Sequence, residues 1–136
     1  MKNLIFSFII SLLTLNLSAA HFIGGEITWE CNTDIFSTDY GKYTFFLTIY
    51  QDCDGIDFSF ISEDIIVHNN PSTTLITCNW ISTNDISATG FSSSQPCYNC
   101  DNQPFGEFGA VKQWNYSSGP ISLNGTPPIG GWHFIW

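Results

Sequence analysis

Basic residues are almost absent from this sequence of 136 residues. It contains three Lys and Arg residues against twelve Asp and Glu residues, a formal net charge of −9 at pH 7. Proteins that bind nucleic acid through phosphates, or that bind anionic membrane surfaces, rely on clusters of Lys and Arg. The composition therefore excludes nucleic-acid binding through phosphates and argues against binding to an anionic membrane surface, and we expect no nucleic-acid partner.

Helical periodicity and catalytic motifs are also lacking. No stretch of ten residues places apolar side chains at helical spacing, and no local Ser–His–acid or Cys–His pattern is present. The apolar content of 43% nevertheless excludes a disordered chain. We therefore expect a folded domain without helices, and we expect it not to be an enzyme.

The first residues have the pattern of an export signal. Lys2 supplies a positive charge, an apolar run follows over 4–13, and Ser18-Ala19-Ala20 offers small residues for a signal peptidase. The apolar run is short for a membrane span of about 20 residues. We predict a cleaved signal peptide over 1–20 and a secreted or cell-surface domain over 21–136, with no membrane span after cleavage.

Five cysteines follow the signal, as is typical of proteins in an oxidising compartment. Because five is odd, we expect four of them to form disulfide bonds and one to be unpaired within this chain, with the pairing left open. Two of them form a CxxC pair, which we interpret as structural and not as a zinc or redox site, because no second CxxC is present. The cysteines are Cys31, Cys53, Cys78, Cys97 and Cys100.

The sequence ends inside an apolar run that favours β structure, Gly130 to Trp136. Natural termini are usually polar and frayed. The expectation is that the chain is the front part of a longer protein and that a partner cysteine lies beyond Trp136.

Alternating apolar and polar side chains predict several β-strands. The clearest run covers 42–50, where residues alternate over eight positions and are mostly β-branched or aromatic. A long loop pinned by disulfide bonds is expected over 82–110. Short strands separated by turn formers predict one all-β domain, a disulfide-bonded antiparallel β-sandwich of Ig-like or jelly-roll-like type. The other predicted strands are 26–31, 58–60, 65–67, 75–80 and 132–136.

Two metal sites are chemically conceivable, although we expect no cofactor. Asp52, Asp54 and Asp57 surround a glycine and could bind calcium, but Asp and Gly also favour an ordinary turn. Cleavage after Ala20 would make His21 the N-terminal residue. Its amine and ring could then bind copper together with His68 or His133, as in copper-dependent oxidases.

Two segments resemble the N-terminal domain of large secreted surface proteins of Bacteroidetes-type bacteria, the PKD-domain or gliding-motility-associated group. His21–Cys31 reads HFIGGEITWEC and Tyr43–Cys53 reads YTFFLTIYQDC, with Gln51 where the family usually has Arg. Pro120–Trp132 is also similar, and in the family the next strand runs into a Cys-Cys-Arg-Asn motif. The resemblance implies export, surface display and further β-sandwich domains, and it provides no catalytic residues.

These observations predict a non-catalytic structural or adhesion module at the front of a larger exported surface protein. Its partners would be other domains of the same protein, or surface glycans or proteins contacted through exposed aromatic side chains. The alternatives are a copper-dependent oxidase that uses His21 and a calcium-stabilised carbohydrate-binding module.

Overall fold

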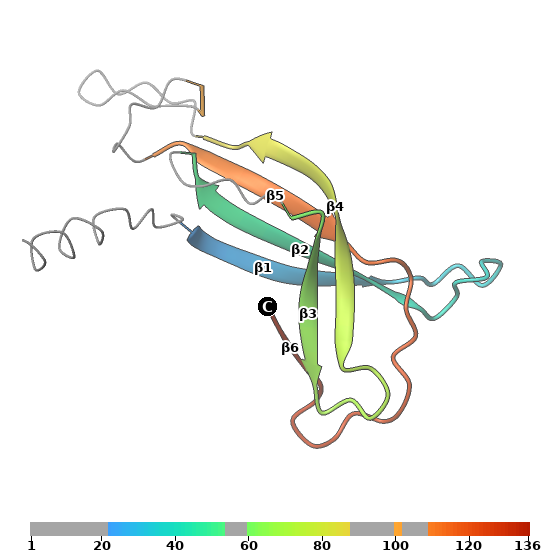
Figure 1. Ribbon diagram of the computed structural model, residues 1–136. Coiled ribbons are helices and arrows are strands. Elements are labelled where there is room, and N and C mark those ends of the chain that lie inside the picture. The colour runs from blue at the N-terminus through green and yellow to red at the C-terminus, as the bar shows by residue number, and fades with distance from the viewer. Residues whose placement is uncertain (1–21, 54–59, 88–99, 102–108) are drawn as a thin grey trace, which may run out of the picture.

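The computed structural model of the chain describes residues 22–53, 60–87, 100–101 and 109–136 (Figure 1). The predicted signal peptide and His21 lie outside these residues. Within them all regular structure is β-strand, and no helix is long and apolar enough to cross a membrane. The six strands are β1 (Phe22–Cys31), β2 (Tyr43–Asp52), β3 (Ser62–His68), β4 (Leu75–Asp85), β5 (Val111–Ser117) and β6 (His133–Ile135).

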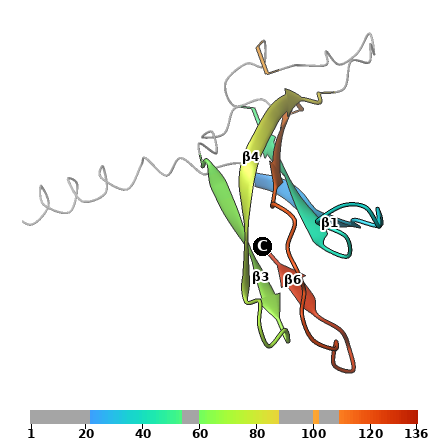
Figure 2. The same ribbon diagram turned by 90° about the vertical axis from the view of Figure 1, so that its right-hand side faces the viewer.

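The strands form one antiparallel sheet in the order β1-β2-β5-β4-β3-β6. The sheet curves until β3 and β4 lie across from β1 and β2 (Figure 2). The two edges of the sheet come close together. The ring of Trp136, just after β6, lies 5.3 Å from the ring of Phe22 at the start of β1. The predicted all-β, antiparallel architecture is confirmed, in the form of a single sheet that nearly closes into a barrel.

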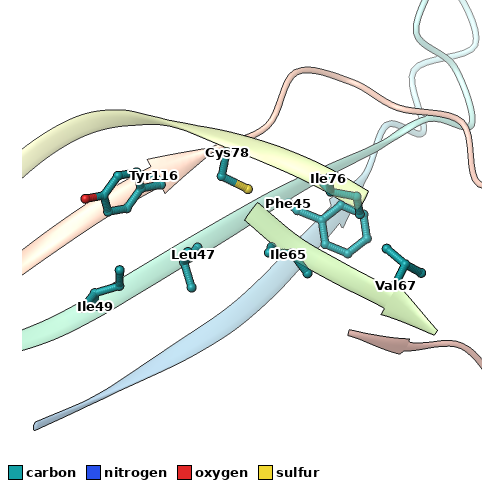
Figure 3. Packing of buried hydrophobic residues seen from close by; sticks show 8 residues of the cluster. All are labelled: Phe45, Leu47, Ile49, Ile65, Val67, Ile76, Cys78 and Tyr116. Carbon is teal, nitrogen blue, oxygen red and sulfur yellow. The ribbon is translucent and has the colours of Figure 1, made fainter. Parts of the chain in front are cut away.

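The core lies inside this curved sheet and is built from the inner faces of four strands (Figure 3). Side chains on a strand alternate between its two faces, so the pattern that predicted β2 also places every second residue inside. The ring of Phe45 packs 4.8 Å from that of Phe134 on β6, which joins the two sides of the curve. The buried cluster comprises Phe45, Leu47, Ile49, Ile65, Val67, Ile76, Cys78 and Tyr116.

Two expectations about loops and strands are corrected. Strand β4 continues to Asp85, so the predicted loop over 82–110 begins with four residues of strand. Strand β5 was not predicted, although Trp114 and Tyr116 alternate with polar residues in it. Phe60 is exposed and lies outside the strands, and the other two residues of the predicted strand 58–60 are outside the described part of the chain.

One disulfide bond, Cys53–Cys100, links the end of β2 to a residue 47 positions later. The backbone N–H of Cys100 donates a hydrogen bond to the carboxylate of Asp85 over 2.9 Å. This contact links the disulfide bond to the end of β4 as well. Hydrogen bonds from Ser87 and from this N–H lower the pKa of Asp85, because they favour its charged form. A disulfide bond is consistent with an extracellular location.

The expectation that four cysteines are paired needs correction. Cys31 and Cys78 are free thiols, and Cys97 lies outside the described residues. Cys78 is fully buried among apolar side chains of the core, and this desolvation raises the pKa of its thiol to about 11. Cys31 is exposed at the end of β1, where it lies opposite Tyr43 at the start of β2. Cys53 follows the last residue of β2, so the two cysteines lie at opposite ends of the β1–β2 ladder.

Candidate binding groove

Strands β1 and β6 are the two edges of the sheet, and they face each other without pairing. Within the described residues, β1 forms a ladder with β2 alone and β6 with β3 alone. Each edge therefore presents backbone N–H and C=O groups that no described strand pairs with, the feature that allows another strand to add to a sheet. We call this gap between β1 and β6 the seam.

Two adjoining grooves run along the seam and share Ile27 and Phe134. The first has a volume of about 450 Å³ and the second about 370 Å³. Both are lined mostly by aromatic and aliphatic side chains, as binding clefts in proteins generally are. The first is lined by Phe22, Gly25, Glu26, Ile27, Leu47, Phe134 and Trp136, and the second by Ile27, Thr28, Trp29, Phe45, Trp132 and Phe134.

Trp136 bridges the seam at one end of the first groove. Its indole N–H donates a hydrogen bond to Glu63 on β3 over 2.9 Å, while its ring lies against Gly25 on β1. A Cβ atom on Gly25 would lie 3.0 Å from the backbone oxygen of Thr48 and 3.5 Å from the Trp136 ring. The absence of a side chain at Gly25 therefore lets the ring approach β1. The adjacent Gly24 has no such neighbour.

Two tryptophans line the second groove. Trp29 on β1 is 58% exposed, although it shares the inner face of the sheet with Ile27. The indole nitrogen of Trp132 is buried and has no hydrogen-bond partner within the described residues. A buried N–H without an acceptor is energetically unfavourable.

The polar groups around the seam are acidic. Tyr50 donates a hydrogen bond of 2.8 Å to Glu26, which raises the pKa of the tyrosine because that bond is lost when Tyr50 ionises. Glu30 is exposed four residues further along β1. Among the residues that the structure describes, no Lys or Arg lines either groove. Lys42 pairs with Asp39 over 2.8 Å, and the ammonium group of Lys112 lies 5.8 Å from the Trp114 ring centroid on β5.

Comparison with known proteins adds no relative. No family model, no curated protein and no solved structure matches the chain.

The structure brings together two of the candidate copper ligands, although no cofactor was expected. His68 on β3 and His133 on β6 lie directly opposite each other in the ladder, and a ring nitrogen of His133 lies 3.1 Å from the carbonyl oxygen of Gly130. Asp52 is buried at the end of β2, whereas Asp54 and Asp57, like His21, lie outside the described part of the chain. Within that part, no three His, Cys, Asp or Glu residues are grouped so that they could hold a metal ion.

Sequence reasoning did not find the seam. Its lining comes from β1, β2 and the segment around β6, which meet only through the strand order, and its outermost residues, Phe22 and Trp136, are 114 positions apart in the chain. The available signal was the run Trp132–Trp136, whose alternating aromatic residues turn out to line both grooves.

Proposed function

We propose that this chain is an exported, non-catalytic module of the cell surface with a structural or adhesive role, and that it binds a polypeptide partner through the seam. The partner is a second protein of the cell surface. The signal-like segment over 1–20, the disulfide bond and the family resemblance support the location.

The observation that carries the binding role is the seam itself. It combines two strand edges without a described partner with an apolar groove, and exposed apolar clefts of this kind mark interaction sites on proteins. A polypeptide can use both features, because its backbone pairs with a strand edge while its side chains fill the groove. A glycan would use only the aromatic side chains, so a polypeptide is the better fit.

A pair of alanine variants tests this function in the natural host. Trp29→Ala removes an aromatic side chain of the seam, whereas Phe36→Ala removes one that is 91% exposed in the β1–β2 connection, outside the seam. We expect Trp29→Ala to lower the amount of protein retained on intact cells severalfold and Phe36→Ala to leave it unchanged. Retention is measured by antibody binding to unpermeabilised cells and by the amount released into the medium.

Equal retention of both variants and the wild-type chain would contradict binding through the seam. Loss of attachment after glycosidase treatment of the cells, with no loss after protease treatment, would assign the partner to glycans. Intact mass of the exported protein, with and without reduction, tests the export step independently. A mature chain that keeps residues 1–20 would contradict the predicted cleavage.

A further inference from the structure

The direction of the two edges restricts what can pair with them. All five neighbouring pairs in the six-stranded sheet are antiparallel, so β1 and β6 run in opposite directions across the seam. A single added strand can therefore be antiparallel to only one of them. Strand β1 has ten residues and β6 has three. Since antiparallel pairing is slightly more stable per residue, β1 offers the better template.

The sequence of β1 then specifies the pattern of the added strand. Opposite residues in a ladder share a face, and the inner face of β1 presents Ile27 and Trp29 to the grooves. Its outer face presents Glu26 and Glu30, four residues apart. A strand paired with β1 therefore places apolar side chains toward Ile27 and Trp29 and sets other side chains, also four residues apart, opposite the two carboxylates.

The negative charge of Glu26 and Glu30 determines which side chains of the added strand fit opposite them. Opposite charges attract across a ladder and like charges repel, so Lys or Arg fits opposite Glu26 and Glu30. A second copy of this chain is a poor occupant, because each copy carries a net charge of −9 and would set carboxylates against carboxylates.

We infer that the partner of the seam is an extended polypeptide segment that adds to β1 in antiparallel orientation, with apolar side chains facing the grooves and Lys or Arg four residues apart on its outer face. This inference rests on the proposed binding function and specifies its partner. According to this inference, the acidic edge of β1 determines which partner binds. The aromatic grooves supply the apolar contacts that bind it.

Three synthetic peptides of about ten residues serve as probes. In the basic peptide, Val and Ile alternate with Thr, and Lys occupies two outer positions four residues apart. The acidic peptide has Glu in place of each Lys. The third peptide has the residues of the basic peptide in scrambled order. Binding to the disulfide-bonded domain is followed by tryptophan fluorescence and calorimetry at low salt. We expect the basic peptide to bind at least about tenfold more tightly than the acidic one, because two charge pairs change from attractive to repulsive. We expect the scramble not to bind.

Charge variants of the protein identify the edge that is used. The double variant Glu26→Lys and Glu30→Lys is expected to invert the preference, so that the acidic peptide binds more tightly than the basic one. The matched control is Asp64→Asn, which removes a carboxylate from the outer face of β3, where Asp64 accepts a hydrogen bond from Thr77. This control is expected to leave both affinities within about twofold, because it faces neither edge of the seam.

The possible results separate this inference from the proposed function. Hydrogen exchange that slows in β1 when the basic peptide binds supports strand addition. Equal binding of basic and acidic peptides overturns the charge rule and leaves binding through the seam intact. If no peptide binds but the Trp29→Ala variant still loses its attachment to cells, strand addition is overturned. The proposed function then stands. Failure of the Trp29→Ala test removes both.

Discussion

Strands β1 and β2 are neighbours in the sequence and in the sheet, and each has ten residues, yet their environments differ sharply. The inner face of β2 is buried from Phe45 to Gln51, whereas most of β1 is exposed, including Trp29 on its inner face. Both strands alternate in a way that indicates one apolar face. The difference arises because β2 has a paired strand on each side, and β1 has one only on the side of β2 within the described residues.

The comparison shows that an apolar strand face is not by itself a core. The apolar face of β2 is opposed by side chains of β3, β4 and β5 in the cluster. The apolar face of β1 borders two grooves, and only Ile27 of its residues packs against the buried cluster. We therefore assign stability mainly to β2 and binding mainly to β1, and the following predictions test this division.

The largest expected effect is at the centre of β2. Phe45 is 1% exposed and packs against Phe134, so Phe45→Ala should lower the free energy of unfolding by about 3–5 kcal/mol through lost burial and a remaining cavity. Phe46, one position along on the outer face of the same strand, is a matched control that should cost less. Urea unfolding followed by tryptophan fluorescence measures both. Equal losses would contradict the one-sided core.

The disulfide bond at the end of β2 comes next. The double variant Cys53→Ser and Cys100→Ser should lower the free energy of unfolding by about 2–4 kcal/mol, because the bond closes a loop with a sequence separation of 47. Cys31→Ser, at an exposed and unpaired position in β1, is the control and should change stability by less than about 0.5 kcal/mol. A large loss from Cys31→Ser would mean that this thiol has a partner.

The two adjacent glycines of β1 should respond differently. Gly25→Ala should lower the free energy of unfolding by about 1–3 kcal/mol, because its new Cβ atom meets the backbone of Thr48 and crowds the Trp136 ring. Gly24→Ala should be neutral or slightly stabilising, since nothing lies within 4 Å of the added atom. Thermal unfolding of the two variants distinguishes them, and identical melting temperatures would contradict the close approach of Trp136.

Cys31 and Cys78, the free thiols among the described residues, should differ in reactivity. The pKa of Cys78 is raised to about 11, so at pH 8 its thiolate population is roughly a hundredfold lower than that of an ordinary thiol. Iodoacetamide should therefore modify Cys31 in the native protein and Cys78 only after unfolding, as located by peptide mass mapping. Because the pKa of Cys78 is higher in the folded than in the unfolded state, its contribution to stability is complete below about pH 9 and is lost as the pH rises toward 11.

The smallest expected effect on stability is at Trp29. Trp29→Ala should change the free energy of unfolding by no more than about 0.5 kcal/mol, because the side chain is 58% exposed, while it should remove binding through the seam. Denaturant unfolding and peptide titration of the same preparation measure the two effects. A decrease of several kcal/mol in the free energy of unfolding would mean that Trp29 belongs to the core and not to the binding surface.

The sequence was sufficient for the strand class and for most strand positions, because period two is a local property. It missed β5, whose only strongly apolar inner residues are Trp114 and Tyr116, and it treated the end of β4 as a loop because Ser82, Thr83 and Asn84 are polar. The disulfide pairing was left open, since burial of Cys78 depends on how distant strands pack. The seam could not be predicted because it is created by the order of the strands.

Residue-resolved hydrogen exchange of the domain alone tests the central claim, that β1 has an open edge and β2 does not. We predict that β2 amides are protected throughout, while about every second amide of β1 exchanges quickly because it points into the seam. Addition of the basic peptide should then protect those β1 amides. Uniform protection of β1 to the level of β2 in the domain alone would contradict the account.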